Sequence, residues 1–256
     1  MVIFLDDGDR VWGLITVTDN ALKPFRWSGA GIALLAFGPL GCMAQNATLS
    51  ARMPVDPQIA AALKQVSARR IQSNIEKLVS FGTRLTLSAQ DPAAIASGHG
   101  IGAARDWIKS ELERYSTDCG GCLEVKTDSF MEHPADRIPQ ATQITNVYAV
   151  LKGTDPERTK QIVLITGHYD SRNSDTLDGN GDAPGANDDG SGTAVSLECA
   201  RVLSKMKFRA TIIFLTVAGE EQGLNGSTHF VKMAKDEGWE LEAVLNNDIV
   251  GGRQER

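Results

Sequence analysis

Three short polar clusters, each flanked by glycine, carry the chemistry that the sequence offers. They read Gly-His-Tyr-Asp-Ser at 167–171, Gly-Ala-Asn-Asp-Asp-Gly-Ser-Gly at 185–192 and Gly-Glu-Glu-Gln-Gly at 219–223. Buried carboxylates are costly unless a positive charge holds them together. A histidine among several acids therefore points to a hard or borderline divalent metal, and we favour zinc. The candidate residues are His168, Asp170, Asp188, Asp189, Glu220 and Glu221.

The first two clusters suggest how a metal would be held. His168 follows an apolar run through Gly167, so we expect its imidazole to project from a strand end into a cleft. A metal-bound histidine usually donates its other N–H to a carboxylate, and Asp170 is placed to accept it. Asp188 stands in a glycine-rich turn before a helical pattern, where backbone amides favour an anion. A carboxylate there can bridge two cations about 3.5–4 Å apart.

The Glu220–Glu221 pair follows another apolar run. Adjacent residues at a strand end point in different directions, so one glutamate can bind metal while the other faces the substrate water. Asp248 follows the last expected strand and adds one more carboxylate. The alternative is that these acids are solvated loop residues. That explanation suits the three aspartates of 175–182, but it does not suit acids that each stand at a strand end.

Helical and extended patterns alternate along the elements that must position these residues. Asp56 as N-cap and Pro57 open one or two helices that run to about residue 80. We expect further helices at 98–116, 190–205 and 224–235, and strands at 123–130, 146–152, 161–166, 210–217 and 241–245. This order indicates an α/β fold with a largely parallel mixed central sheet. Ligands of such sheets gather beyond the carboxyl ends of the strands.

The composition describes an ordinary globular protein with one sizeable core. The 256 residues are 42% hydrophobic and 23% charged, and the formal net charge is −6. This acidity, without any run of lysine or arginine, argues against a nucleic-acid-binding protein. No pattern in the sequence sets the oligomeric state.

Residues 1–54 do not read as part of the folded body. Residues 23–44 have the order of a secretory signal peptide, with a basic segment, a short apolar run and small residues. The run is too short and too interrupted by Gly and Pro to span a bilayer. We therefore expect an exported protein, periplasmic or extracellular, with 45–54 as a linker and 1–22 as a doubtful upstream extension. Lipid attachment at Cys42 is the less favoured alternative.

Cys119 and Cys122 enclose two glycines. A redox pair or half of a zinc site would need a second Cys/His pair or a thioredoxin-like frame, and the sequence offers neither. In an exported protein we expect these cysteines to close a small disulfide turn. Ser191 lacks the Gly-x-Ser-x-Gly elbow of a serine nucleophile, so we assign it to the turn into a helix.

Six motifs follow one another between about residues 59 and 252. They are Ser-Phe-Gly-Thr-Arg ending at 84, Asn-Val-Tyr at 146–148, the three clusters above, and Asn-Asp at 247–248. In this order they resemble the co-catalytic di-zinc aminopeptidases, metallopeptidase family twenty-eight, of the bacterial leucyl-aminopeptidase type. The resemblance implies a three-layer fold of the zinc-peptidase type, similar to phosphorylase/hydrolase folds, with helices on both faces of the sheet.

The resemblance also implies a role for each residue. Asp188 would bridge two zinc ions and precede a cis peptide bond. His168 and Asp248 would complete one zinc site, and Glu221 would belong to the other. Glu220 would be the general base of a metal-assisted hydrolysis, taking a proton from the bridging water and returning it to the leaving amine.

The sequence departs from the family pattern at its far end. Family members have a further zinc-binding histidine well beyond the position of Asp248, and no histidine follows Asp248 here. We therefore expect residues 55–256 to form a zinc peptidase domain that is incomplete at its C-terminal end, with one zinc site short of a ligand. The expected activity is an aminopeptidase acting on peptides. The alternatives are a carboxypeptidase or single-zinc glutaminyl cyclase on the same fold, or a metal-free binding scaffold.

Overall fold

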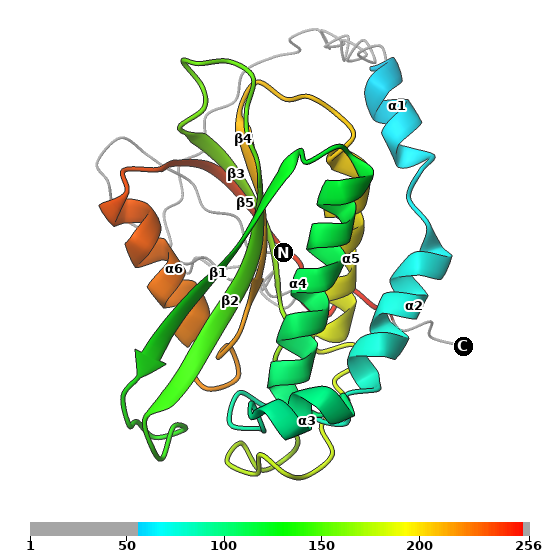
Figure 1. Ribbon diagram of the computed structural model, residues 1–256. Helices are drawn as coiled ribbons and strands as arrows, with labels where there is room; N and C mark the ends of the chain where they lie inside the picture. The colour runs from blue at the N-terminus through cyan, green and yellow to red at the C-terminus, as the bar shows by residue number, and fades with distance from the viewer. Residues whose placement is uncertain (1–55, 253–256) are drawn as a thin grey trace, which may run out of the picture.

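A computed structural model describes residues 56–252 (Figure 1). The helices are α1 (Pro57–Leu63), α2 (Ala68–Val79), α3 (Pro92–Ser97), α4 (Gly100–Asp118), α5 (Gly190–Leu203) and α6 (Asn225–Asp236). The strands are β1 (Leu123–Glu132), β2 (Thr142–Leu151), β3 (Gln161–His168), β4 (Thr211–Val217) and β5 (Glu240–Asn246). The expected signal peptide, linker, upstream extension and lipid site at Cys42 all lie outside the described residues.

The central sheet is mixed and has the strand order β1-β2-β4-β3-β5. β3 pairs in parallel with β4 and β5, whereas β2 pairs antiparallel with β1 and β4. Half of the pairings are therefore antiparallel, more than a largely parallel sheet would have. The short β1–β2 connection contains no crossover helix, and such a connection can join only antiparallel neighbours.

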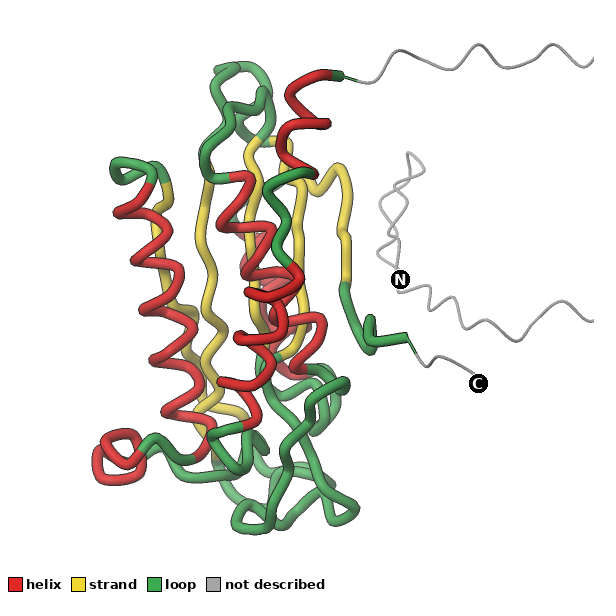
Figure 2. The backbone as a smooth tube through the Cα atoms, turned by 90° about the vertical axis from the view of Figure 1, so that its right-hand side faces the viewer, coloured by secondary structure: helices red, strands yellow, loops and turns green. Residues whose placement is uncertain are grey.

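Helices cover both faces of this sheet, which confirms the expected three-layer α/β fold (Figure 1). α6 lies on one face, where Phe230 packs with Tyr148 of β2 in an apolar cluster. α2, α4 and α5 lie on the other face, over a larger cluster that includes Ile108 and Leu112 of α4. Figure 2 shows the helices standing alongside the strands and long loops gathered at one end of the molecule. Burial of β4 along its whole length agrees with its continuous apolar sequence.

Local signals explain where the elements differ from expectation. The helical region before residue 80 is two helices, because Ser67 caps α2 and its hydroxyl accepts the backbone N–H of Arg70 at 3.3 Å. α3 was not expected, although Asp91 caps it and Pro92 opens it. Gly98 ends α3 in the left-handed conformation, with φ of 73°. β2 begins at residue 142 and β1 ends at 132, both beyond the expected bounds.

A disulfide joins Cys119 to Cys122 in the turn between α4 and β1, as the sequence predicted. This bond closes the turn over two glycines that both have positive φ. Within residues 56–252, each helix is too short or too polar to cross a membrane.

Candidate metal centre

The loops after β3, β4 and β5 meet the turn before α5 at the carboxyl end of the parallel strands. β3 ends at His168, which lies opposite Val217, the last residue of β4. Parallel neighbours deliver the residues that follow them to the same edge of a sheet. The structure therefore brings all the predicted site residues into one cluster: His168, Asp170, Asp188, Glu220, Glu221 and Asp248.

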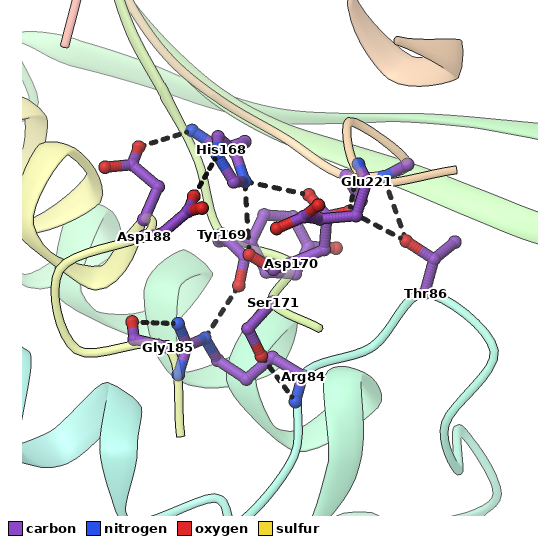
Figure 3. A network of polar contacts seen from close by, with 12 residues as sticks. Arg84, Thr86, His168, Tyr169, Asp170, Ser171, Gly185, Asp188 and Glu221 are labelled. Atoms are coloured by element: carbon purple, nitrogen blue, oxygen red, sulfur yellow. Dashed lines mark hydrogen bonds and ion pairs between the residues drawn. The ribbon is translucent and has the colours of Figure 1, made fainter. Parts of the chain in front are cut away.

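His168 lies at the centre of this cluster (Figure 3). Its ring is buried, with Nε2 3.2 Å from Asp188 Oδ1 and 3.9 Å from Asp248 Oδ1. Nδ1 lies on the other side of the ring, 3.3 Å from the carboxylate of Asp170. Burial opposes a charge on the imidazole, but the hydrogen bonds with Asp170 and Asp188 outweigh it and raise the pKa of His168 well above its ordinary value. One ring nitrogen thus faces two carboxylates, and a third carboxylate orients the ring.

Asp170 is itself held in place by two donors. Its Oδ2 accepts the hydroxyl of Thr86 at 3.0 Å and the backbone N–H of Glu221 at 3.1 Å. The Thr86 hydroxyl in turn accepts the N–H of Gly219 at 3.1 Å. Asp170 is completely buried, so it links the His168 loop to the Glu220–Glu221 loop without contact with solvent. Figure 3 shows Asp170 between His168, Thr86 and Glu221.

Asp170→Asn is expected to weaken zinc binding at His168 about 10- to 100-fold, because the orienting charge behind the ring is lost. The affinity is measured by competition with a chromophoric chelator. Asp175→Asn, on the exposed loop after β3, is the matched control and should leave the affinity unchanged. Equal zinc affinities for Asp170→Asn and the wild type would contradict the orienting role.

Asp188 and Asp189 are adjacent but differ in role. A cis peptide bond joins them, as the family resemblance implied. Asp188 is half-exposed and faces His168, whereas Asp189 is buried and caps α5. The Asp189 carboxylate accepts the backbone N–H groups of His168 at 3.0 Å, Gly192 at 2.9 Å and Ile249 at 3.3 Å. Burial raises the pKa of Asp189 to about 7. Asp189 therefore ties three loops together, which leaves Asp188 free to bind a ligand.

Gly192 explains why the turn into α5 is rich in glycine. A Cβ on this residue would collide with the carbonyl oxygen of Asn247 and with the Asp189 carboxylate. The first turn of α5 can therefore lie directly against the segment that follows β5. That close approach places Asp248 beside His168.

Glu220 and Glu221 occupy different environments, as expected for neighbours at a strand end. Gly219, with φ of 74°, turns the chain out of β4 just before them. Glu221 is buried, and burial together with the charges of Asp188 and Asp170 raises its pKa to about 7. Burial is also the main cause of the raised pKa of Glu220. Within the described residues, the Glu220 carboxylate forms no hydrogen bond or ion pair, so it is free to exchange a proton.

Arg84 is the central support of the site (Figure 3). Its buried guanidinium donates to the carbonyls of Tyr169 at 2.7 Å, Leu78 at 3.0 Å, Pro184 at 2.8 Å and Gly185 at 2.9 Å. Burial lowers the pKa of Arg84 to about 10 despite the nearby aspartates. The side chain thus ties the end of α2 to the His168 loop and to the Asp188 loop. The sequence indicated Arg84 only as part of a motif and gave no role for it.

Asn146 of β2 supports the loop that carries the two glutamates. Its Oδ1 accepts the N–H of Ala218 at 3.2 Å, and its Nδ2 donates to the carbonyl of Gly226 at 2.9 Å. The same amide donates to Asp128, which also lies 3.0 Å from His229 Nδ1. His229 therefore pairs with Asp128 and lies outside the metal cluster.

The geometry of the cluster fits a divalent metal. Ligand atoms of His168, Asp188 and Glu221 all lie within 4.8 Å of one another. Glu221 Oε1 is buried without a hydrogen-bond partner among the described residues, which is costly unless a cation binds it. One imidazole with carboxylates is a donor set that zinc accepts. A second group of such atoms contains Asp189, but three backbone N–H groups already occupy that carboxylate.

Part of the chain is similar to a known family of peptidases. Residues 146–256 match the model of Peptidase family M28. A curated relative from Leptosphaeria maculans, described as a probable zinc metalloprotease, is 48% identical over 197 residues. Those residues make up 77% of this chain and 44% of the relative. Residues 146–256 belong to Peptidase family M28. The M28 region begins at Asn146 and includes all six residues of the cluster.

Solved structures share the fold of this chain. The Legionella pneumophila LapA aminopeptidase has 26% identity and a TM-score of 0.57, over 77% of this chain and 47% of its own. A Porphyromonas gingivalis glutaminyl cyclase has 23% identity and a TM-score of 0.57, over 74% of this chain and 63% of its own. The cyclase shows a common fold alone. The chain spans less than half the length of the curated relative and of LapA.

Proposed function

We propose that this chain carries the metal-binding part of a zinc aminopeptidase that releases N-terminal residues from peptides. The observation that carries the proposal is the grouping of His168, Asp188 and Glu221 within 4.8 Å, beside a half-buried Glu220. The name of the Leptosphaeria relative supports zinc and peptide hydrolysis. The likeness to LapA supports an aminopeptidase.

Two zinc ions are proposed, with Asp188 between them. His168 Nε2 faces both Asp188 and Asp248, which supports one site, and Glu221 groups with Asp188 on the other side, which supports a second. When bound, zinc supplies Lewis acidity that activates water and polarises the peptide carbonyl. Asp170 keeps the ring of His168 oriented so that Nε2 can act as a ligand.

Glu220 is the proposed general base. Its carboxylate is free of other partners in the described part of the chain, and its raised pKa brings it closer to neutral pH, where a base is most effective. Glu220 accepts a proton from the attacking water and returns it to the scissile nitrogen, which leaves as the new N-terminal amine of the shortened peptide. The two steps balance, so the carboxylate is regenerated at each turnover.

We also propose that the protein is exported. The Cys119–Cys122 disulfide supports this, because such bonds persist in oxidising compartments.

Metal content and product analysis test the enzymatic proposal. The full chain is purified with zinc, zinc per chain is measured by plasma mass spectrometry, and hydrolysis is followed on aminoacyl-anilides and on free peptides. Two zinc ions and release of free N-terminal residues are expected, and both should disappear with 1,10-phenanthroline. Release of C-terminal residues or cyclisation of N-terminal glutamine would replace the aminopeptidase proposal with a carboxypeptidase or a cyclase. A chain that binds no zinc would overturn all three.

A further inference from the structure

Arg172 forms an ion pair with a proposed metal ligand. This residue follows Ser171 in the loop after β3, and its Nε lies 2.7 Å from Glu221 Oε2. The two side chains differ in exposure, at 46% for Arg172 and 8% for Glu221. A half-exposed guanidinium thus reaches from solvent to a buried carboxylate. In the described part of the chain, Arg172 is the only cationic side chain paired with Glu221.

The cation of Arg172 faces the same carboxylates that are proposed to hold the second zinc. It binds one oxygen of Glu221, whose carboxylate groups with His168 and Asp188. The other oxygen of Glu221 remains buried without a partner among residues 56–252. Arg172 therefore balances the charge of Glu221 but leaves one of its two oxygens without a partner. A divalent cation that binds both oxygens can replace the arginine.

We propose that Arg172 is a displaceable counter-ion for the second zinc site, an inference that rests on the proposed two-zinc function. A metal ion that binds Glu221 through both oxygens needs Oε2, which the guanidinium now holds, so the metal must displace Arg172. The exposed side of the arginine lets the displaced guanidinium move into solvent at little cost. The ion pair with Arg172 thus lowers the affinity of the second site and leaves the His168–Asp248 site unaffected.

Zinc titration of the full chain tests this proposal. Binding is measured by competition with a chromophoric chelator, and native mass spectrometry counts the ions bound at each step. Arg172→Gln is expected to tighten the weaker zinc event roughly fivefold, the scale of a partly exposed ion pair, and to leave the tighter event unchanged. Arg172→Lys keeps the positive charge and should stay closer to the wild type than to Arg172→Gln.

Arg137 supplies the matched control. Its guanidinium also contacts Glu221, but it donates to the backbone carbonyl at 2.9 Å and does not contact the carboxylate. Arg137→Gln removes the same charge from the same neighbourhood without freeing the proposed ligand. It should change the weaker event less than Arg172→Gln does.

Several outcomes would overturn the proposal. One is an equal gain of zinc affinity in Arg137→Gln. Another is a weaker zinc-binding event in Arg172→Gln whose affinity is unchanged or reduced. The third is the absence of a second zinc-binding event from both the wild type and Arg172→Gln. In each case, an unchanged tighter zinc-binding event would still support zinc binding at His168. Loss of both events in the wild type would overturn the zinc proposal itself, and the role of Arg172 with it.

Discussion

Glu220→Gln is expected to reduce turnover of an aminoacyl-anilide about 10²- to 10⁴-fold while zinc remains bound. Glutamine has nearly the shape of glutamate but cannot accept a proton. Glu220 is half-buried, and its carboxylate has no other partner within the described residues, so the substitution leaves no charged group unpaired. The loss should therefore appear in kcat, and KM should change little. Steady-state kinetics and zinc analysis of the same preparation measure both quantities.

Glu157→Gln is the matched control for this experiment. Glu157 is an exposed residue of the loop between β2 and β3, at the opposite end of β3 from His168. This variant should retain full turnover and full zinc content. If Glu220→Gln lost zinc in proportion to turnover, Glu220 would be a ligand and the proposed base would be wrong. Turnover at the wild-type rate with zinc bound would exclude Glu220 from the chemistry.

The sequence predicted the candidate ligands because each stands where an apolar run ends. β3 and β4 are buried strands, and polar residues directly after such strands reach the carboxyl edge of the sheet. His168 and the two glutamates could therefore be assigned to one site from their positions alone. All of these residues lie within the region that matches family M28, and their roles stay predictions.

The supports of the site could not be predicted in the same way. Arg84 lies 85 residues from Tyr169 and 101 from Gly185 along the chain, and its partners are backbone carbonyls that leave no pattern in the sequence. The Asp170–Thr86 contact likewise spans 84 residues. The pairing of Arg172 with Glu221 depends on how two loops meet. Helix α3, by contrast, could have been predicted, because Asp91 and the proline after it are a typical start of a helix.

Arg84→Met is expected to lower the free energy of unfolding by about 3–5 kcal/mol, because several buried carbonyls lose their donor at about 1–3 kcal/mol each and partly find others. Methionine fills similar space but donates no hydrogen bond, so four carbonyl groups lose their donor. The affected segments are the end of α2 and the loops of His168 and Asp188. Urea unfolding measured by circular dichroism, without zinc, gives the difference directly.

The contacts of Arg84 also predict which part of the molecule its loss would disturb. Gly185 has φ of 43°, and a Cβ there would lie 2.5 Å from the Cβ of Ser171, so the two loops that Arg84 joins are already in close contact. Without the guanidinium these loops should separate, and Arg84→Met should bind zinc more weakly than the wild type even under conditions where it is fully folded. Arg209→Met removes an exposed arginine paired with Asp155 and should change neither the urea midpoint nor the zinc affinity. If Arg84→Met were as stable as this control, the four carbonyls would have found other donors. The positions of His168 and Asp188 would then depend on the contacts of Asp170 and Asp189 rather than on Arg84.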